Sequence, residues 1–92
     1  MNTYASKAIV NQFQLNTCLE EARDAVVSCE SFLRGPYRDS ALKEVRQLRS
    51  RLYAVFVAAD DATSSPFELT REVEACIKRL NSIRTAAQYL AH

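Results

Sequence analysis

The sequence predicts an all-α protein, a three-helix bundle, and three observations support this fold class. Apolar residues recur at alternating steps of three and four in three separate segments, which is the spacing of one helix face. The 92 residues include one glycine and two prolines, so few positions would interrupt a helix. Strand-type alternation of apolar and polar residues extends over only a few positions at a time. A chain of this length is expected to form one domain, residues 1–92.

The first helix is expected over about residues 3–34, where a broad apolar stripe leads up to Gly35. The stripe consists of Leu15, Cys18, Leu19, Ala22, Ala25, Val26, Cys29, Phe32 and Leu33. Thr17 and Glu20 have the spacing of a capping box, which allows a break near residues 16–17. Residues 3–14 then either continue the helix or form a separate arm. Such an arm could pack on its own chain or on a partner.

The second helix is expected over about residues 37–59. Gly35 can close the preceding helix in a left-handed conformation, and Asp39 or Ser40 is a suitable N-cap. The apolar face is formed by Ala41, Val45, Leu48, Leu52, Val55 and Ala59. A short polar loop follows at residues 60–65, so the second and third helices should pack as an antiparallel pair.

The third helix, over about residues 66–91, has the clearest start. Ser65 is a favoured N-cap, Pro66 suits the first helical position, and Glu68 completes a capping box. The apolar face is formed by Leu69, Val73, Cys76, Leu80, Ile83, Ala87 and Leu90. The other side of this helix is polar, which predicts burial of a single face.

Charge and cysteine content limit the possible partners and location. Twelve basic and eleven acidic residues give a net charge of +1, which disfavours general attraction to nucleic acid. The three cysteines lack a Cys-x-x-Cys pattern, which predicts reduced thiols and a cytoplasmic protein. A bridge between Cys29 and Cys76 is the alternative. No signal-peptide pattern occurs, and the longest apolar run of eight residues is too short for a membrane span.

The sequence offers little for catalysis, so we expect a non-enzymatic protein with no catalytic residues, metal or cofactor. The sole histidine is His92, the last residue, and Gly35 stands alone rather than in a phosphate-binding loop. The alternative is a helical enzyme that holds a dianionic substrate with arginine and lysine side chains. Arg23, Arg34 and Arg38 form no recognisable pattern for that chemistry.

Residues 52–59 are apolar throughout, although one helix face needs only half of them. Tyr53, Ala54 and Val57 project from the side opposite the core, and Phe56 lies on the flank. Either the N-terminal arm covers this side or another subunit does. Because monomers rarely expose such patches, we expect a homo-oligomer or a complex with a partner protein.

A basic cluster lies just upstream on the same helix, formed by Lys43, Arg46 and Arg49. Arg46, Arg49 and Tyr53 share one sector of the helix, where they could bind an anion and stack a base. The sequence therefore predicts a protein-interaction module, an adaptor, regulator or inhibitor of a larger protein. The alternative is a module that binds nucleic acid, a nucleotide or another anion through this basic cluster.

Overall fold

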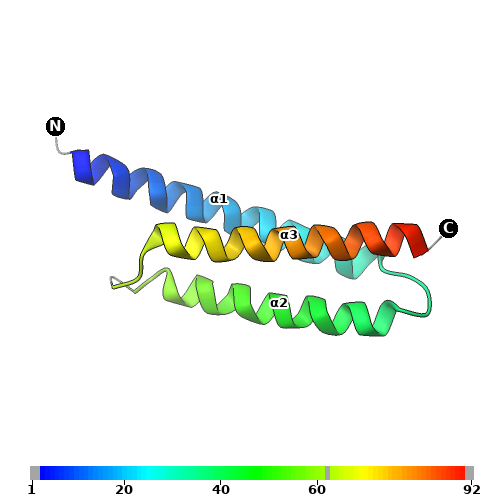
Figure 1. The fold of residues 1–92 in the computed structure, drawn as a ribbon. Helices are drawn as coiled ribbons and strands as arrows, with labels where there is room; N and C mark the ends of the chain where they lie inside the picture. The colour runs from blue at the N-terminus through cyan, green and yellow to red at the C-terminus, as the bar shows by residue number, and fades with distance from the viewer. Residues whose placement is uncertain (1–2, 62, 91–92) are drawn as a thin grey trace.

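Three α-helices run up, down and up along one axis in the computed structural model, which describes residues 3–61 and 63–90 (Figure 1). They are α1 (Thr3–Phe32), α2 (Arg38–Ala58) and α3 (Pro66–Leu90). Within the described residues there is no strand, which confirms the predicted all-α class. The molecule is a rod of 56 × 20 × 16 Å, and α1 shares its most extensive contact with α3.

The core is one layer of side chains that runs along the axis between the three helices. It follows the predicted faces closely, and its members are Leu15, Ala22, Val26, Cys29, Leu33, Leu42, Val45, Leu48, Leu52, Val55, Val73, Cys76, Leu80 and Ile83. Ala41 and Ala59, expected in the core, are only partly buried, and Leu42 is buried instead of Ala41. Leu90 lies outside the side chains that the structure describes.

Helix α1 is continuous through residues 16–17, so the structure has no break there. The Thr17 hydroxyl donates a hydrogen bond to the Phe13 carbonyl oxygen at 3.0 Å, as threonine does inside a helix. The predicted capping box at Thr17 is therefore wrong. The part of α1 that precedes Leu15 projects past the end of the bundle (Figure 1). Within it, Val10 and Phe13 are 53% and 70% exposed.

The end of α1 differs from the sequence expectation in one residue. Phe32 was placed on the apolar stripe, but its side chain is 71% exposed and only Leu33 is buried. The spacing of three and four residues admits both positions, and the packing of α1 on α3 selects one of them. Gly35 has a φ of 89°, the left-handed conformation that the sequence predicts at this position.

Helix α2 begins earlier than its expected caps. Its first residue is Arg38, and the N-cap position, Tyr37, makes no side-chain capping hydrogen bond. The prediction of Asp39 or Ser40 as N-cap is therefore wrong. The Arg38 N–H bonds to the Gly35 carbonyl oxygen at 3.1 Å, so the turn around Gly35 leads directly into the helix.

Helix α3 begins as predicted. The Ser65 hydroxyl oxygen accepts a hydrogen bond from the Glu68 N–H at 3.4 Å, and Pro66 is the first helical residue. In the preceding loop, the Asp61 carboxylate accepts bonds from the N–H and the hydroxyl of Thr63 at 2.9 and 2.8 Å. These two bonds lower the pKa of Asp61 and make its role in the loop structural.

Ion pairs connect the helices at the surface. Arg49 of α2 pairs with Glu30 of α1 at 3.3 Å, and Arg51 of α2 pairs with Glu72 of α3 at 3.7 Å. Arg79 of α3 donates a hydrogen bond to Glu44 of α2. Each of these exposed pairs contributes at most about 1 kcal/mol to stability. No helix in the described part of the chain is apolar over a length that could cross a membrane.

Candidate interaction surface

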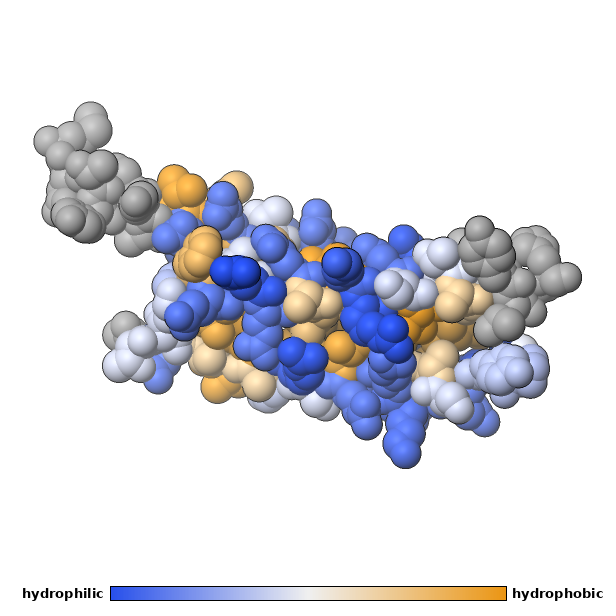
Figure 2. Space-filling view, viewed as in Figure 1, coloured by the Kyte–Doolittle hydropathy of each residue, from blue (hydrophilic) through white to orange (hydrophobic). Residues whose placement is uncertain are grey.

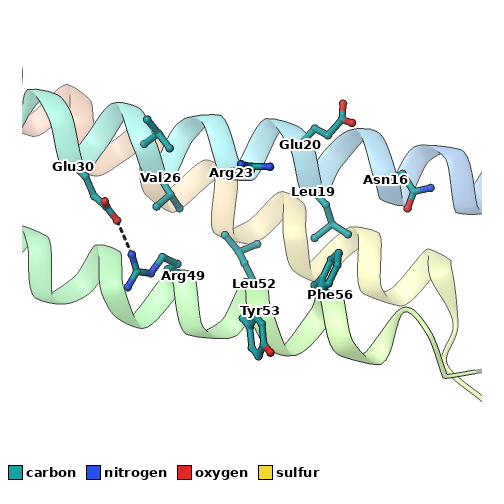
Figure 3. Close-up of a pocket in the computed structure, with 11 residues that line it drawn as sticks. Asn16, Leu19, Glu20, Arg23, Val26, Glu30, Arg49, Leu52, Tyr53 and Phe56 are labelled. Carbon is teal, nitrogen blue, oxygen red and sulfur yellow. Dashed lines mark hydrogen bonds and ion pairs between the residues drawn. The ribbon is translucent and has the colours of Figure 1, made fainter.

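A groove of about 620 Å³ runs between α1 and α2 on one side of the rod (Figure 3). We call it the α1–α2 groove. Its apolar lining consists of Leu19, Val26, Val27, Leu52, Tyr53 and Phe56. Its polar lining consists of Asn16, Glu20, Arg23, Glu30 and Arg49. The groove is therefore an apolar trough whose charged side chains include two acids and two arginines.

The groove follows from how the helices pack. Because α1 packs mainly on α3, it meets α2 over a smaller area, and the two helices leave space between them on the outer side. Val26 and Leu52 form the floor, where they are 5% and 7% exposed and also belong to the core. The Arg49–Glu30 ion pair closes the groove at one end, as the dashed line in Figure 3 shows.

The aromatic residues of α2 stand on the rim of the groove. Phe56 points toward α1, whereas Tyr53 directs its hydroxyl away from α1 (Figure 3). They are 61% and 69% exposed, and Val57, on the outer side of α2, is 54% exposed. Ala54 is exposed as well. Figure 2 views the rod from the opposite side, that of α3, where hydrophobic side chains are interspersed among hydrophilic ones.

The described hydrophobic side chains of the N-terminal segment are exposed, as are those of the outer face of α2. Val10 and Phe13, two hydrophobic residues of this segment whose side chains the structure describes, are more than half exposed. Tyr53, Phe56 and Val57 are also more than half exposed. Coverage of this face by the arm, by a second copy or by a different protein stays a prediction.

The basic cluster is divided by the packing. Arg49 lines the α1–α2 groove, where its Nη1 lies 3.3 Å from Glu30 Oε1. Arg46 and Lys43 are exposed, lie outside the groove lining, and form no ion pair with any residue that the structure describes. In the sector of Arg46, Arg49 and Tyr53, the positive charge of Arg49 is therefore paired within the chain, and that of Arg46 remains available.

The α1 side of the groove was missed in the sequence. Leu19 and Val26 were assigned to the core stripe, Glu20 to a capping box, and Arg23 to no site. One signal was present: Val27 is an apolar residue outside the expected stripe, and its side chain is 56% exposed. Together with Val26 it widens the apolar surface of α1 toward α2.

The titratable groups indicate structural roles. Burial raises the pKa of all three thiols, Cys18, Cys29 and Cys76, which weakens them as nucleophiles. All three are free, and the Cys29 thiol donates to the Leu80 carbonyl oxygen at 3.4 Å. Among residues 3–61 and 63–90, no three His, Cys, Asp or Glu side chains group as metal ligands would.

Comparison with known proteins yields no relative: the chain matches no protein-family model, no curated protein and no solved structure.

Proposed function

We propose that this chain is a small non-enzymatic protein-interaction module that associates with copies of itself through the α1–α2 groove and the adjoining outer face of α2. The observation that carries the proposal is the exposure of Tyr53, Phe56 and Val57, each more than half accessible, beside an apolar trough. Exposed apolar patches with aromatic centres are typical of protein interfaces. Within the cell we place it in the cytoplasm, since its three thiols are free.

The charges of the groove favour a protein surface over a polyanion. Two acids, Glu20 and Glu30, balance Arg23 and Arg49 in the lining. Nucleic-acid sites instead concentrate positive charge, because each phosphate contact needs a cation. A neutral apolar trough suits a helix with apolar and mixed-charge residues. Once associated, such a module would act as an adaptor, regulator or inhibitor of a larger protein.

Light scattering after size-exclusion chromatography tests the self-association. The parent protein is expected to have a mass above the 10.4 kDa of one chain, and Phe56→Glu or Val57→Glu should reduce it. Phe67→Glu is the matched control, because Phe67 of α3 is 56% exposed but does not line the groove. A parent protein that stays at the mass of one chain at all concentrations would contradict self-association.

A second candidate function is anion binding on the outer face of α2. One observation favours it: Lys43 and Arg46 are exposed, one turn apart, and free of ion pairs within the described chain. Titration with heparin or an oligonucleotide at rising salt, with Arg46→Glu and Arg49→Glu as comparison, tests this candidate. Binding that is independent of salt, or that both variants retain, would eliminate it.

A further inference from the structure

We propose that the occupant of the α1–α2 groove is α1 of a second copy, which lies antiparallel to α1 about a two-fold axis between Glu21 and Ala22. This inference rests on the proposed self-association and specifies its geometry. A two-fold dimer is the commonest closed assembly, and its interface must be complementary to itself. One feature of α1 meets that requirement directly, and two further features describe the surface that the contact would bury.

The first feature is a self-complementary pair of charges. Glu20 and Arg23 both line the α1–α2 groove, and both are exposed. Neither forms an ion pair with any described residue of its own chain, and Glu20 points away from α2 (Figure 3). The proposed axis places Glu20 of each copy opposite Arg23 of the other. A parallel arrangement would oppose like charges, so the charges select the antiparallel one.

The second feature is the distribution of exposed apolar side chains along the same face. The axis that pairs Glu20 with Arg23 also sets Val27 of one copy opposite Asn16 of the other. Phe13 comes opposite Glu30, at the end of the groove where Arg49 lies. Phe13 and Val27 are 70% and 56% exposed in the single chain. Together with the rim residue Phe56, they would lose contact with water in the dimer.

The third feature is the length of α1. Its described N-terminal part extends beyond the bundle (Figure 1), and helical segments of about 12 residues are marginal in water without packing. The proposed axis overlaps residues 11–32 of the two copies, a length of about 33 Å at 1.5 Å per residue, and so packs the last turn of this projecting part, residues 11–14. A stable interface needs about 800 Å² from each partner. One long side of a rod with 6931 Å² of surface can supply that area.

Charge reversal with rescue tests the arrangement. Glu20→Arg and Arg23→Glu each place two like-charge pairs in the dimer, so each is expected to raise the dissociation constant about tenfold or more. The double variant Glu20→Arg/Arg23→Glu restores opposite charges across the axis and should return the constant to within about threefold of the parent value. Analytical ultracentrifugation measures all four proteins, and circular dichroism verifies that each is folded.

Lys78→Glu is the control, since Lys78 is an exposed residue of α3 outside the groove and should leave the dissociation constant unchanged. Weakening by both single variants with rescue by the double variant supports the inference. Single variants without effect, in a protein whose self-association still depends on Phe56, would overturn the antiparallel α1 contact and leave the proposed function standing. Single variants that weaken the dimer without rescue would overturn the proposed axis. A monomeric parent protein would overturn both.

Discussion

Individual residues buried between the three helices contribute strongly to the stability of the rod. Leu80, Val45 and Leu15 are each 0% exposed, and each comes from a different helix. In a single-layer core these side chains have few neighbours that can move in to fill a void. Truncation at one of these positions therefore leaves a cavity as well as a loss of buried apolar surface.

Leu80→Ala is expected to lower the free energy of unfolding by about 2–5 kcal/mol. Because small domains are stable by only about 5–15 kcal/mol, the loss should be visible as a large shift of the denaturation midpoint. Urea denaturation followed by circular dichroism measures it. Lys78→Ala, an exposed change in the same helix, should stay within about 0.5 kcal/mol of the parent protein. Similar losses in both variants would contradict the assigned core.

The three thiols should react in two groups with Ellman's reagent at pH 8. Cys29 and Cys76 are 1% and 0% exposed, whereas Cys18 is only partly buried. We expect Cys18 to react first, and the other two to react only as fast as the protein opens, since the thiolate must reach the reagent. Cys18→Ala should remove the faster phase. A single phase for all three thiols in the native protein would contradict this order.

Glu44 makes the stability of the fold slightly dependent on pH. The side-chain hydrogen bond from Arg79 lowers the pKa of Glu44, and the charge of Arg79 acts in the same direction. Because the pKa of Glu44 is lower in the folded state than in the unfolded state, ionised Glu44 stabilises the fold. This contribution is fully present above the pKa of the unfolded state and is lost as the pH falls through the pKa of the folded state. The contribution should stay below about 1 kcal/mol, because the Glu44 side chain is 37% exposed.

Arg79→Ala is therefore expected to raise the pKa of Glu44 toward that of an ordinary glutamate, as measured by carbon NMR of its carboxyl group. Arg71→Ala is a control, because Arg71 is an exposed residue of the same helix that stacks on Phe67 instead. An unchanged Glu44 pKa in Arg79→Ala would show that the bond does not form in solution.

The helices differ in how their ends are fixed. Helix α3 has a side-chain cap at Ser65, whereas α2 starts at a turn and has no side-chain cap. The turn before α2 depends on Gly35, whose φ of 89° would strain any residue with a side chain. A Cβ at Gly35 would meet no atom within 4 Å, so the strain would come from the backbone alone.

Ser65→Ala is expected to reduce the free energy of unfolding by about 0.5–2 kcal/mol, because the Glu68 N–H loses its partner. Ser82→Ala is the matched control within the same helix. The Ser82 hydroxyl bonds to the Lys78 carbonyl oxygen in mid-helix, where alanine is the better helix former, so this change should not destabilise the protein. Equal losses for both variants would argue against a cap at Ser65.

The sequence predicted the helices and their buried faces well, and it predicted their ends less reliably. The step of three and four residues determines which side chains share a face, and Val73, Cys76, Leu80 and Ile83 are buried as expected. The capping assignments at Thr17 and at Asp39 or Ser40 were wrong because a capping residue is also compatible with helix interior. Whether such a residue caps a helix or lies inside one depends on whether the turns on both sides of it pack against the rest of the protein.

At the scale of the whole molecule, the α1–α2 groove could be predicted only in part. The apolar run on α2 indicated that Tyr53 and Val57 would not fit the core, and both are exposed. The opposite wall could not be predicted, because it depends on α1 packing more closely on α3 than on α2. The spacing of apolar residues in the sequence indicates which face of each helix is buried, but it does not determine how far apart two helices lie.

The elongated shape gives a further expectation for the assembled protein. The Cα radius of gyration is 15.5 Å, against about 12 Å for a compact domain of this length. Such a thin rod should gain stability from a second copy, so the thermal midpoint of the parent protein should rise with protein concentration. Differential scanning calorimetry over a hundredfold range tests this. The Phe56→Glu variant should show no such rise.

The dominance of the α1–α3 contact also has a consequence for how the chain is made. Synthesis proceeds from the N-terminus, so α1 leaves the ribosome well before α3, the helix on which it mainly packs, has been translated. During that interval the apolar stripe of α1 meets only water, chaperones or α2. The native arrangement therefore becomes available only after α3 has emerged, and α1 has to wait for its main partner until that point.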